Sequence, residues 1–461
     1  SDNTYYLENV SIDSYRCKTN TVSATAFRGF GGPQGALGIE QVIDDIAFSL
    51  GKDPLAVRKV NFYGICERNI THYGQQLKDN VIADLVATLE KSSDYAGRRK
   101  QIRAFNADSA YLRKGIALTP LKYGISFTAP HLNQAGALLH VYTDGSVMLN
   151  HGGTEMGQGL FTKVAQVVSE ELMIDVDRIR ITASDTSKVP NTSATAASSG
   201  SDLNGKAAQA AARQIRDRLT DFVSGHFGVA REAVHFIRNG VAAGNKFIEF
   251  AELARLAHFH QISLSATGYY RTPALDWDGA AFAGKRPFYY FAYGAAVSEV
   301  IIDTLTGENR VLRVDILHDV GRSLNPAIDR GQIEGAFAQG MGWLTMEELC
   351  WNGQGKLMTH APSTYKIPVA SDMPRDFRVA LYASSGNVED SIFRSKAVGE
   401  PPLLHGISVF HAIRDAIASV TDYAMSPRLD APATAERILF SVEDLRRRAT
   451  QPQVTSELVA S

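Results

Sequence analysis

Cysteine is scarce in this chain, which has only three among its 461 residues: Cys17, Cys66 and Cys350. They lie far apart and form no CxxC pair, so no disulfide framework is expected and a reducing, cytoplasmic compartment fits. The same scarcity excludes a four-cysteine iron–sulfur cluster or a structural zinc site built from this chain alone. The twelve histidines show no HExxH spacing either. A metal that works here must be held by something other than protein side chains.

Long hydrophobic runs and an excess of charge are absent as well. No stretch of about 18 apolar residues occurs, so no transmembrane helix is predicted. The net charge of −2 gives no reason to expect nucleic acid or a charged membrane as partner. The first residues, from Ser1, lack the basic and apolar regions of a signal peptide. We interpret this start as an internal cut in a longer polypeptide.

The patterns that are present alternate between helix and strand, which predicts an α+β fold of mixed sheets with packed helices. Asp144-Gly145 and residues 305–307 each separate two strand-like segments and predict hairpins. A further strand is expected at 176–183. The last residues, 444–461, hold little apolar material and are expected to form a mobile tail. Helices are expected at residues 33–50, 54–61, 81–91, 92–110, after 159, up to about 222, 326–343 and 403–417.

Four loops share one design, in which glycine or other small residues come just before a helix. They are residues 27–34, 152–159, 195–200 and 399–400. Glycine permits close approach of the backbone to a ligand, and helix N-termini present free N–H groups to anions. The spacing is neither the dinucleotide-binding fingerprint nor a P-loop. We therefore expect the four loops to form walls around a bulky anionic cofactor.

Glu400 lies in the last of these loops, directly before Pro401 and Pro402. The fixed φ of proline suits the first turn of a helix, and apolar residues then recur at helical spacing. Glu400 therefore falls at the start of a helix, where the dipole favours an anion. A carboxylate held there is a candidate general base. The alternative is a plain capping glutamate at the helix N-terminus.

Two aromatic residues stand among small or polar neighbours. Phe30 lies between Gly29 and Gly31, and Phe127 lies within residues 124–128. Taken singly, each is a typical core residue. Together they are candidates to clamp a flat heteroaromatic substrate by stacking.

Six segments resemble the molybdenum-cofactor-binding part of the xanthine oxidase family of molybdenum hydroxylases. Several are long enough to make chance agreement remote. The segments are Phe-Arg-Gly-Phe-Gly-Gly-Pro-Gln (27–34), Gly-Ile-Ser-Phe-Thr (124–128), His-Gly-Gly-Thr-Glu-Met-Gly-Gln-Gly (151–159), Thr-Ala-Ala-Ser (195–198), Ser-Leu-Asn-Pro-Ala-Ile-Asp (323–329) and Lys-Ala-Val-Gly-Glu-Pro-Pro (396–402).

The resemblance implies a role for each matching position. Glu400 falls on the family's catalytic base, Phe30 and Phe127 on the aromatics that sandwich the purine, and Thr128 on a substrate contact. In the family the metal is held by the pterin dithiolene, which would explain the missing cysteine and histidine ligands. Further positions fall on the cofactor site: Arg28 and Ala197 line the molybdenum, and Gly157, Gln158, Gly159, Ala196 and Gln332 contact the pterin.

The resemblance also implies a reaction and partners. Members of the family that act on purines oxidise hypoxanthine to xanthine and xanthine to urate with oxygen from water, and pass electrons through two [2Fe–2S] clusters and FAD to NAD. The clusters and FAD would lie in a partner subunit or domain, and a dimer of such units is expected. Residues 1–105 would end a first molybdenum-cofactor-binding domain, and residues 106–443 would form a second.

One departure keeps alternatives open. In the family, an upstream segment supplies a Gln beside the metal and a Glu and an Arg that read the purine, and this sequence starts downstream of it. The complete pocket would need that segment. Because the purine-reading residues are not here, an aldehyde oxidase or another N-heterocycle hydroxylase is the alternative enzyme. A cofactor-free assembly subunit is the alternative outside catalysis.

Overall fold

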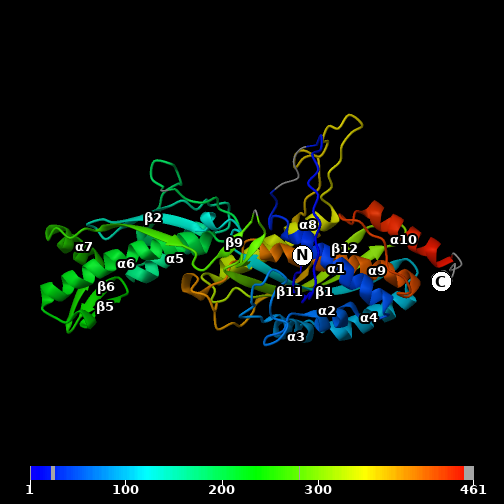
Figure 1. The fold of residues 1–461 in the computed structure, drawn as a ribbon, viewed down its shortest axis with the longest axis horizontal. Helices are drawn as coiled ribbons and strands as arrows, with labels where there is room; N and C mark the ends of the chain where they lie inside the picture. The colour runs from blue at the N-terminus through cyan, green and yellow to red at the C-terminus, as the bar shows by residue number, and fades with distance from the viewer. Residues whose placement is uncertain (1, 22–25, 190, 280, 451–461) are drawn as a thin grey trace.

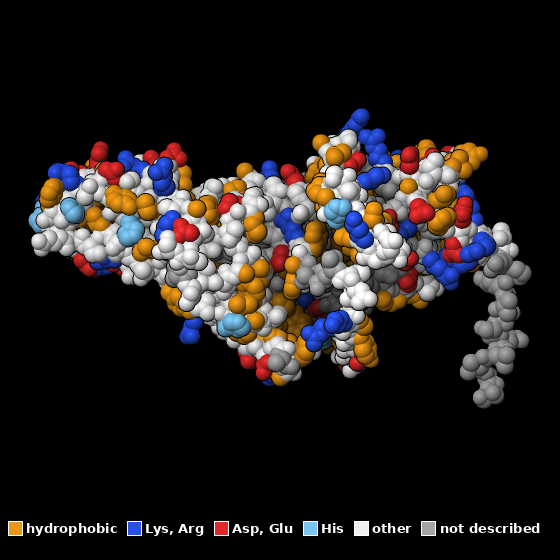
Figure 2. Space-filling view, turned by 90° about the horizontal axis from the view of Figure 1, so that it is seen from above, with side chains coloured by type: hydrophobic (Ala, Val, Ile, Leu, Met, Phe, Trp, Pro, Cys, Tyr) orange, Lys and Arg blue, Asp and Glu red, His pale blue; other side chains and the backbone are white. Residues whose placement is uncertain are grey.

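The computed structural model describes residues 2–21, 26–189, 191–279 and 281–450. Figure 1 shows an elongated molecule with two parts. We call residues 134–271 the lobe, which forms one end of the molecule, and the described residues of 2–125 and 287–450 the body. Seen from above, acidic and basic side chains are interspersed over the visible face (Figure 2). Among the described residues, no helix combines the length and the hydropathy needed to cross a membrane.

The body is built on a four-stranded sheet with the order β1-β11-β12-β13. Its first three strands are antiparallel neighbours, and β13 runs parallel to β12. β1 and β11 are buried along most of their length, as expected of strands covered on both faces. The strands are β1 (Leu112–Ile125), β11 (Tyr290–Asp303), β12 (Asn309–His318) and β13 (Asp376–Leu381).

Helices cover both faces of this sheet. The alternation of side chains along β1 sends Ile116 and Leu118 into one core and Ala117 and Leu121 into the other. Packed mainly in the first core are α1 (Gly32–Ser49), α2 (Pro54–Asn61), α3 (Ile82–Ser92) and α4 (Tyr95–Asp108). Packed in the second are α8 (Pro326–Thr345), α9 (Ile407–Ala418) and α10 (Ala435–Thr450).

The lobe, like the body, is a sheet with helices packed on it. Its strands have the order β4-β3-β2-β8, and the long helix α6 packs across the sheet. Small, fully buried residues such as Ala207 and Ala211 let α6 approach the strands closely. The lobe contains β2 (Gln134–Val141), β3 (Val147–His151), α5 (Leu160–Leu172), β4 (Ile179–Ile181), α6 (Gly200–Phe227), β5 (Val234–Ile237), β6 (Gly240–Ala243), β7 (Lys246–Glu249), α7 (Phe250–Phe259) and β8 (Ser265–Arg271). A two-stranded hairpin follows, β9 (Asp276–Asp278) and β10 (Ala283–Arg286).

In both parts, a helix packs directly on a strand at a glycine. A Cβ placed on Gly115 of β1 would lie 2.0 Å from the carbonyl oxygen of Ala412 in α9. A Cβ on Gly268 of β8 would lie 1.9 Å from the carbonyl oxygen of Ala207 in α6. Contacts this short are impossible for any other residue, so these glycines set the distance between helix and sheet.

The α+β prediction is confirmed, as are both hairpins, β2–β3 and β11–β12. Three details differ. The strand expected at 176–183 is only β4, because Val176–Arg178 form a 3₁₀ turn. The helix after Glu400 begins as a 3₁₀ segment, Pro401–Gly406. The expected mobile tail is wrong for residues 444–450, which belong to α10 with Leu445 fully buried; residues 451–461 lie outside the described part of the chain.

Candidate active site

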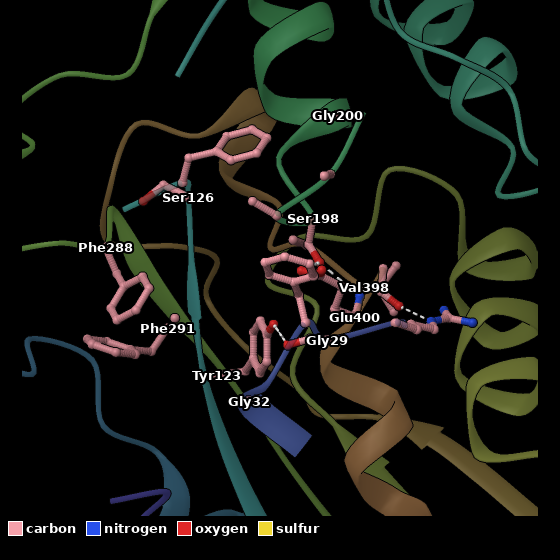
Figure 3. Close-up of a pocket in the computed structure, with 18 of the residues that line it drawn as sticks. Gly29, Gly32, Tyr123, Ser126, Ser198, Gly200, Phe288, Phe291, Val398 and Glu400 are labelled. Atoms are coloured by element: carbon pink, nitrogen blue, oxygen red, sulfur yellow. Dashed lines mark hydrogen bonds between the residues drawn. The ribbon is translucent and has the colours of Figure 1, made fainter. Parts of the chain in front are cut away.

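The four small-residue loops meet at a cavity of about 1450 Å³ between the lobe and the body. Figure 3 shows residues from several elements directed toward it. Ten of the eleven predicted site residues line this cavity: Arg28, Phe30, Phe127, Thr128, Gly157, Gln158, Ala196, Ala197, Gln332 and Glu400. The eleventh, Gly159, begins helix α5 and faces α8 instead, since a Cβ there would lie 2.8 Å from Cδ1 of Ile328.

Glu400 is half-buried at the cavity wall, immediately before the 3₁₀ segment. The Ser198 hydroxyl donates to Oε2 of Glu400 at 2.8 Å, and the Glu400 backbone N–H donates to Oγ of Ser198 at 2.8 Å (Figure 3). This double contact fixes both the backbone and the carboxylate of Glu400. Ala197 and Ser198 both have a positive φ, 55° and 56°. Two consecutive non-glycine residues in this strained region indicate a loop shaped for function.

Tyr123 of β1 lies beside Glu400 and was not predicted as a site residue. Its hydroxyl donates to the carbonyl oxygen of Gly29 at 2.7 Å (Figure 3). Burial, together with the neighbouring Glu400 carboxylate, holds the pKa of Tyr123 well above its usual range, so its hydroxyl stays protonated. No local pattern in the sequence singles out Tyr123, because Phe127 lies beyond the end of β1 and the strand period does not connect the two residues.

Arg28 links three parts of the cavity wall. Its guanidinium donates to the carbonyl oxygen of Gly399 at 2.6 Å, to Oε1 of Gln339 at 2.9 Å and to Oε1 of Gln332 at 3.1 Å. Burial lowers the pKa of Arg28 to about 10, although the Glu400 carboxylate opposes this change. The guanidinium therefore remains a cation near neutral pH. It brings a positive charge to the cavity and ties the first glycine loop to α8 and to the segment that carries Glu400.

The loop before α5 presents backbone to the cavity. Gly157 has a φ of +93°, and a Cβ placed on it would meet nothing within 4 Å. The Gln158 side chain folds back on its own loop, donating to the carbonyl oxygen of Thr154 at 2.7 Å. A side chain at position 157 would both strain the backbone and intrude on the open space.

The two predicted aromatic residues lie on the same cavity but differ in exposure. Phe30 is 71% exposed, and Phe127 is half-buried. The buried side chain of Asn133 accepts from the Phe127 N–H and donates to the Phe127 carbonyl oxygen, both at 2.9 Å. This contact, which sequence reasoning missed, fixes the backbone that carries Phe127 and leads into Thr128.

The residues present fit a large organic cofactor better than a bare metal ion. Among the described residues, no group of three or more His, Cys, Asp or Glu side chains is arranged to hold a metal. The cavity exceeds the 300–1,000 Å³ typical of small-molecule sites, which leaves room for a cofactor and a flat substrate together. Exposed glycine backbone on one wall and the Arg28 cation on another suit a bulky group with negative charge.

Family models support the same conclusion independently. A model described as "Molybdopterin cofactor-binding domain" matches residues 88–374, and a second model with the same description matches residues 1–62. The xanthine dehydrogenase/oxidase of Gallus gallus is 47% identical over 440 residues, which are 95% of this chain and 31% of that protein. The xanthine dehydrogenase of Calliphora vicina is 44% identical over 446 residues, 96% of this chain and 31% of that protein. The chain thus spans less than a third of these relatives.

Solved structures share the fold at lower identity. Quinoline 2-oxidoreductase from Pseudomonas putida 86 superposes with a TM-score of 0.78 at 24% identity, over 91% of this chain and 53% of that one. A Cu,Mo-CO dehydrogenase superposes with a TM-score of 0.77 at 22% identity and the same coverage. The resemblance inferred from the six sequence segments is confirmed, and the chain belongs to the molybdopterin cofactor-binding domain family.

Proposed function

We propose that this chain is the molybdenum-cofactor part of a xanthine dehydrogenase, with Glu400 as the general base of purine hydroxylation. The observation that carries the proposal is the position of the Glu400 carboxylate. It lies where the four loops converge, fixed by Ser198 and close to the Arg28 cation. A carboxylate that served only to cap a helix would need neither the cavity nor the strained loop that holds it.

The cofactor would occupy the part of the cavity lined by backbone and amide groups. Gly157, Gln158, Ala196 and Gln332 would contact its pterin, with Gly159 shaping the loop behind them. Arg28 and Ala197 would line the molybdenum. When bound, the molybdenum–molybdopterin group would supply the oxygen that is added to the purine and accept two electrons.

The protein's own residues would orient the substrate and move the proton. Phe30 and Phe127 stack on the two faces of the purine, and Thr128 contacts its edge. Glu400 accepts a proton at its carboxylate, while Ser198 keeps that carboxylate aimed at the cavity. Arg28 offsets the negative charge that gathers there.

The remaining parts of the enzyme would come from outside this chain. An upstream segment of the same subunit would complete the purine site. Two [2Fe–2S] clusters and FAD in a partner subunit or domain would carry electrons to NAD, in a cytoplasmic dimer of such units. Two separate family matches, at residues 1–62 and 88–374, support a division of the chain into the end of one cofactor-binding domain and a second domain. We place these domains at residues 1–105 and 106–443.

The test is Glu400→Gln in the complete enzyme, because the amide keeps the shape and removes the base. Turnover of xanthine should fall about 10²- to 10⁴-fold, with molybdenum content unchanged. Glu334→Gln is the matched control, since Glu334 is an exposed carboxylate on α8 that does not line the cavity. Near-normal turnover by the fully loaded Glu400→Gln enzyme would refute the assignment.

A further inference from the structure

A buried carboxylate connects the lobe to the segment that carries Glu400. Asp202 lies in the first turn of α6, just after the loop that holds Ser198. Asp202 is buried, with 6% of its surface exposed. The Tyr290 hydroxyl donates to Oδ2 of Asp202 at 2.7 Å, and the Ile392 backbone N–H donates to Oδ1 at 3.2 Å. Both carboxylate oxygens are therefore engaged by the body.

Tyr290 also makes a hydrogen bond to the segment that carries Glu400. The Tyr290 hydroxyl oxygen accepts a hydrogen bond from the Ala397 backbone N–H at 2.9 Å, while the same hydroxyl donates its hydrogen bond to Asp202. Ala397 is three residues before Glu400. A chain of two hydrogen bonds thus runs from α6 through β11 to the backbone beside the proposed base.

The residue directly before Ala397, Lys396, is held by ion pairs. Nζ of Lys396 lies 2.7 Å from Asp319 and 2.6 Å from Asp79, and all three side chains are largely buried. These carboxylates raise the pKa of Lys396, so this attachment keeps its charge across the physiological range. The attachment through Tyr290 differs, because it depends on the protonation state of Asp202.

The surroundings of Asp202 favour its neutral form. Tyr290 of β11, Tyr289 just before it and Tyr270 of β8 face the Asp202 carboxylate. Lys206 of α6 and Lys163 of α5 are the nearby cations. Both lysines are engaged elsewhere, Lys206 with Asp390 at 2.9 Å and Lys163 with Asp329 at 2.5 Å. Burial consequently raises the pKa of Asp202 to about 6, against the lowering effect of the Tyr290 hydrogen bond.

We propose that Asp202 is a positioning residue for Glu400, whose ionised carboxylate orients the Tyr290 hydroxyl and thereby holds the Ala397 backbone. The inference rests on the proposed role of Glu400. Protonated Asp202 brings its own hydrogen toward Tyr290, whose oxygen already accepts from Ala397, so the directed chain is lost. Activity then depends on a group that lines the cavity but does not transfer the reacting proton.

The experiment uses the complete enzyme with Asp202→Asn, Tyr290→Phe and the double variant. Asp217→Asn is the matched control, because Asp217 lies on the same helix with its side chain 68% exposed. At pH 8, Asp202→Asn should lower kcat about tenfold, the worth of one hydrogen bond to a charged group, with KM and molybdenum content within about twofold. The double variant should match the worse single variant, since both break one chain of contacts.

The pH profile separates positioning from a general structural role. The ratio of wild-type to Asp202→Asn kcat should shrink toward 1 as pH falls from 8 to 5, because wild-type Asp202 then becomes neutral as well. A merely structural role predicts the same ratio at every pH.

Thermal unfolding tests the protonation of Asp202 without an activity measurement. The folded protein favours protonated Asp202, so this group adds stability at low pH that is lost as pH rises through about 6. The Tm of wild type relative to Asp202→Asn should therefore fall between pH 4 and 7, and Asp217→Asn should show no such trend. If Asp202→Asn does not accumulate, Tyr290→Phe decides, because it keeps the carboxylate and removes one hydroxyl.

Three results would overturn the inference: loss of cofactor from Asp202→Asn, a kcat ratio that does not change with pH, or additive effects in the double variant. The result for Glu400→Gln keeps the two proposals apart. If Glu400→Gln retains turnover, the general-base assignment fails. If Glu400→Gln is inactive while Asp202→Asn and Tyr290→Phe behave as wild type, only the positioning role fails.

Discussion

The loops that enclose the cavity present small residues at several positions on the lobe side, whereas two loops on the body side present a guanidinium and a carboxylate. The lobe contributes Gly157, Ala196 and Ala197. The body contributes Arg28 and Glu400, whose side chains are fixed by contacts with other elements. The lobe wall fits a ligand by leaving space and exposing N–H groups, and the body wall acts on it through charge.

The difference predicts how each wall responds to substitution. A shortened side chain on the body wall removes a specific contact, so the effect should fall on rate and cofactor loading. An added side chain on the lobe wall meets neighbours or strains a positive φ, so its effect should fall on stability.

Arg28→Ala should have the largest effect. It removes the contacts to Gly399, Gln339 and Gln332 together. At about 1.5–3 kcal/mol for a hydrogen bond to a charged group, loss of even two of them corresponds to roughly a 10²-fold or greater fall in kcat/KM. Steady-state kinetics and molybdenum analysis of the complete enzyme would measure the loss.

Arg28→Lys sharpens this prediction. Lysine keeps the charge but cannot reproduce the planar fork that reaches three acceptors, so we expect an intermediate loss. Arg238→Ala is the control, because Arg238 lies in the lobe with its side chain 82% exposed. Full activity in Arg28→Ala would contradict the assignment of chemistry to the body wall.

Gly159→Ala should have a moderate effect, on stability rather than rate. Gly159 has a φ of +74°, and its Cβ would lie 2.8 Å from Ile328 of α8, at the junction of lobe and body. Overpacking and backbone strain of this kind cost about 1–3 kcal/mol, which thermal unfolding would detect as a lower Tm. Gly38→Ala in α1 is the control, because its Cβ would meet nothing within 4 Å, and alanine favours a helix by about 1 kcal/mol over glycine.

Local signals in the sequence predicted much of the fold and the position of Glu400. The helix Pro54–Asn61 follows from Asp53, whose carboxylate accepts from the Leu55 N–H at 2.8 Å, as expected of an N-cap before proline. The hairpin β2–β3 follows from Asp144-Gly145. Glu400 was predicted at the start of a helix by the prolines after it, and it lies there.

What sequence reasoning missed depends on contacts between distant residues. Ser198 and Glu400 are separated by 202 positions, and Asp202 and Tyr290 by 88. No local pattern sets these pairs, because they form only after α6 has packed across the lobe sheet and β11 has paired with β1. The strand expected at 176–183 was too long for a related reason: the apolar residues there predict a strand, but Val176–Arg178 form a 3₁₀ turn with no buried residue, and only Ile179–Ile181 pair as β4.

Phe30→Ala should have the smallest effect, and it tests whether the exposed edge of the body wall serves the substrate. Phe30 is 71% exposed, so its removal should leave the Tm and molybdenum content unchanged. Lost stacking, worth about 0.5–1.5 kcal/mol, should raise KM for xanthine roughly 3- to 10-fold. Phe259→Ala is the control, because Phe259 is 69% exposed on α7, away from the cavity. Loss of molybdenum along with the rise in KM would instead make Phe30 part of the cofactor wall, and the division between the two walls would no longer hold at this edge.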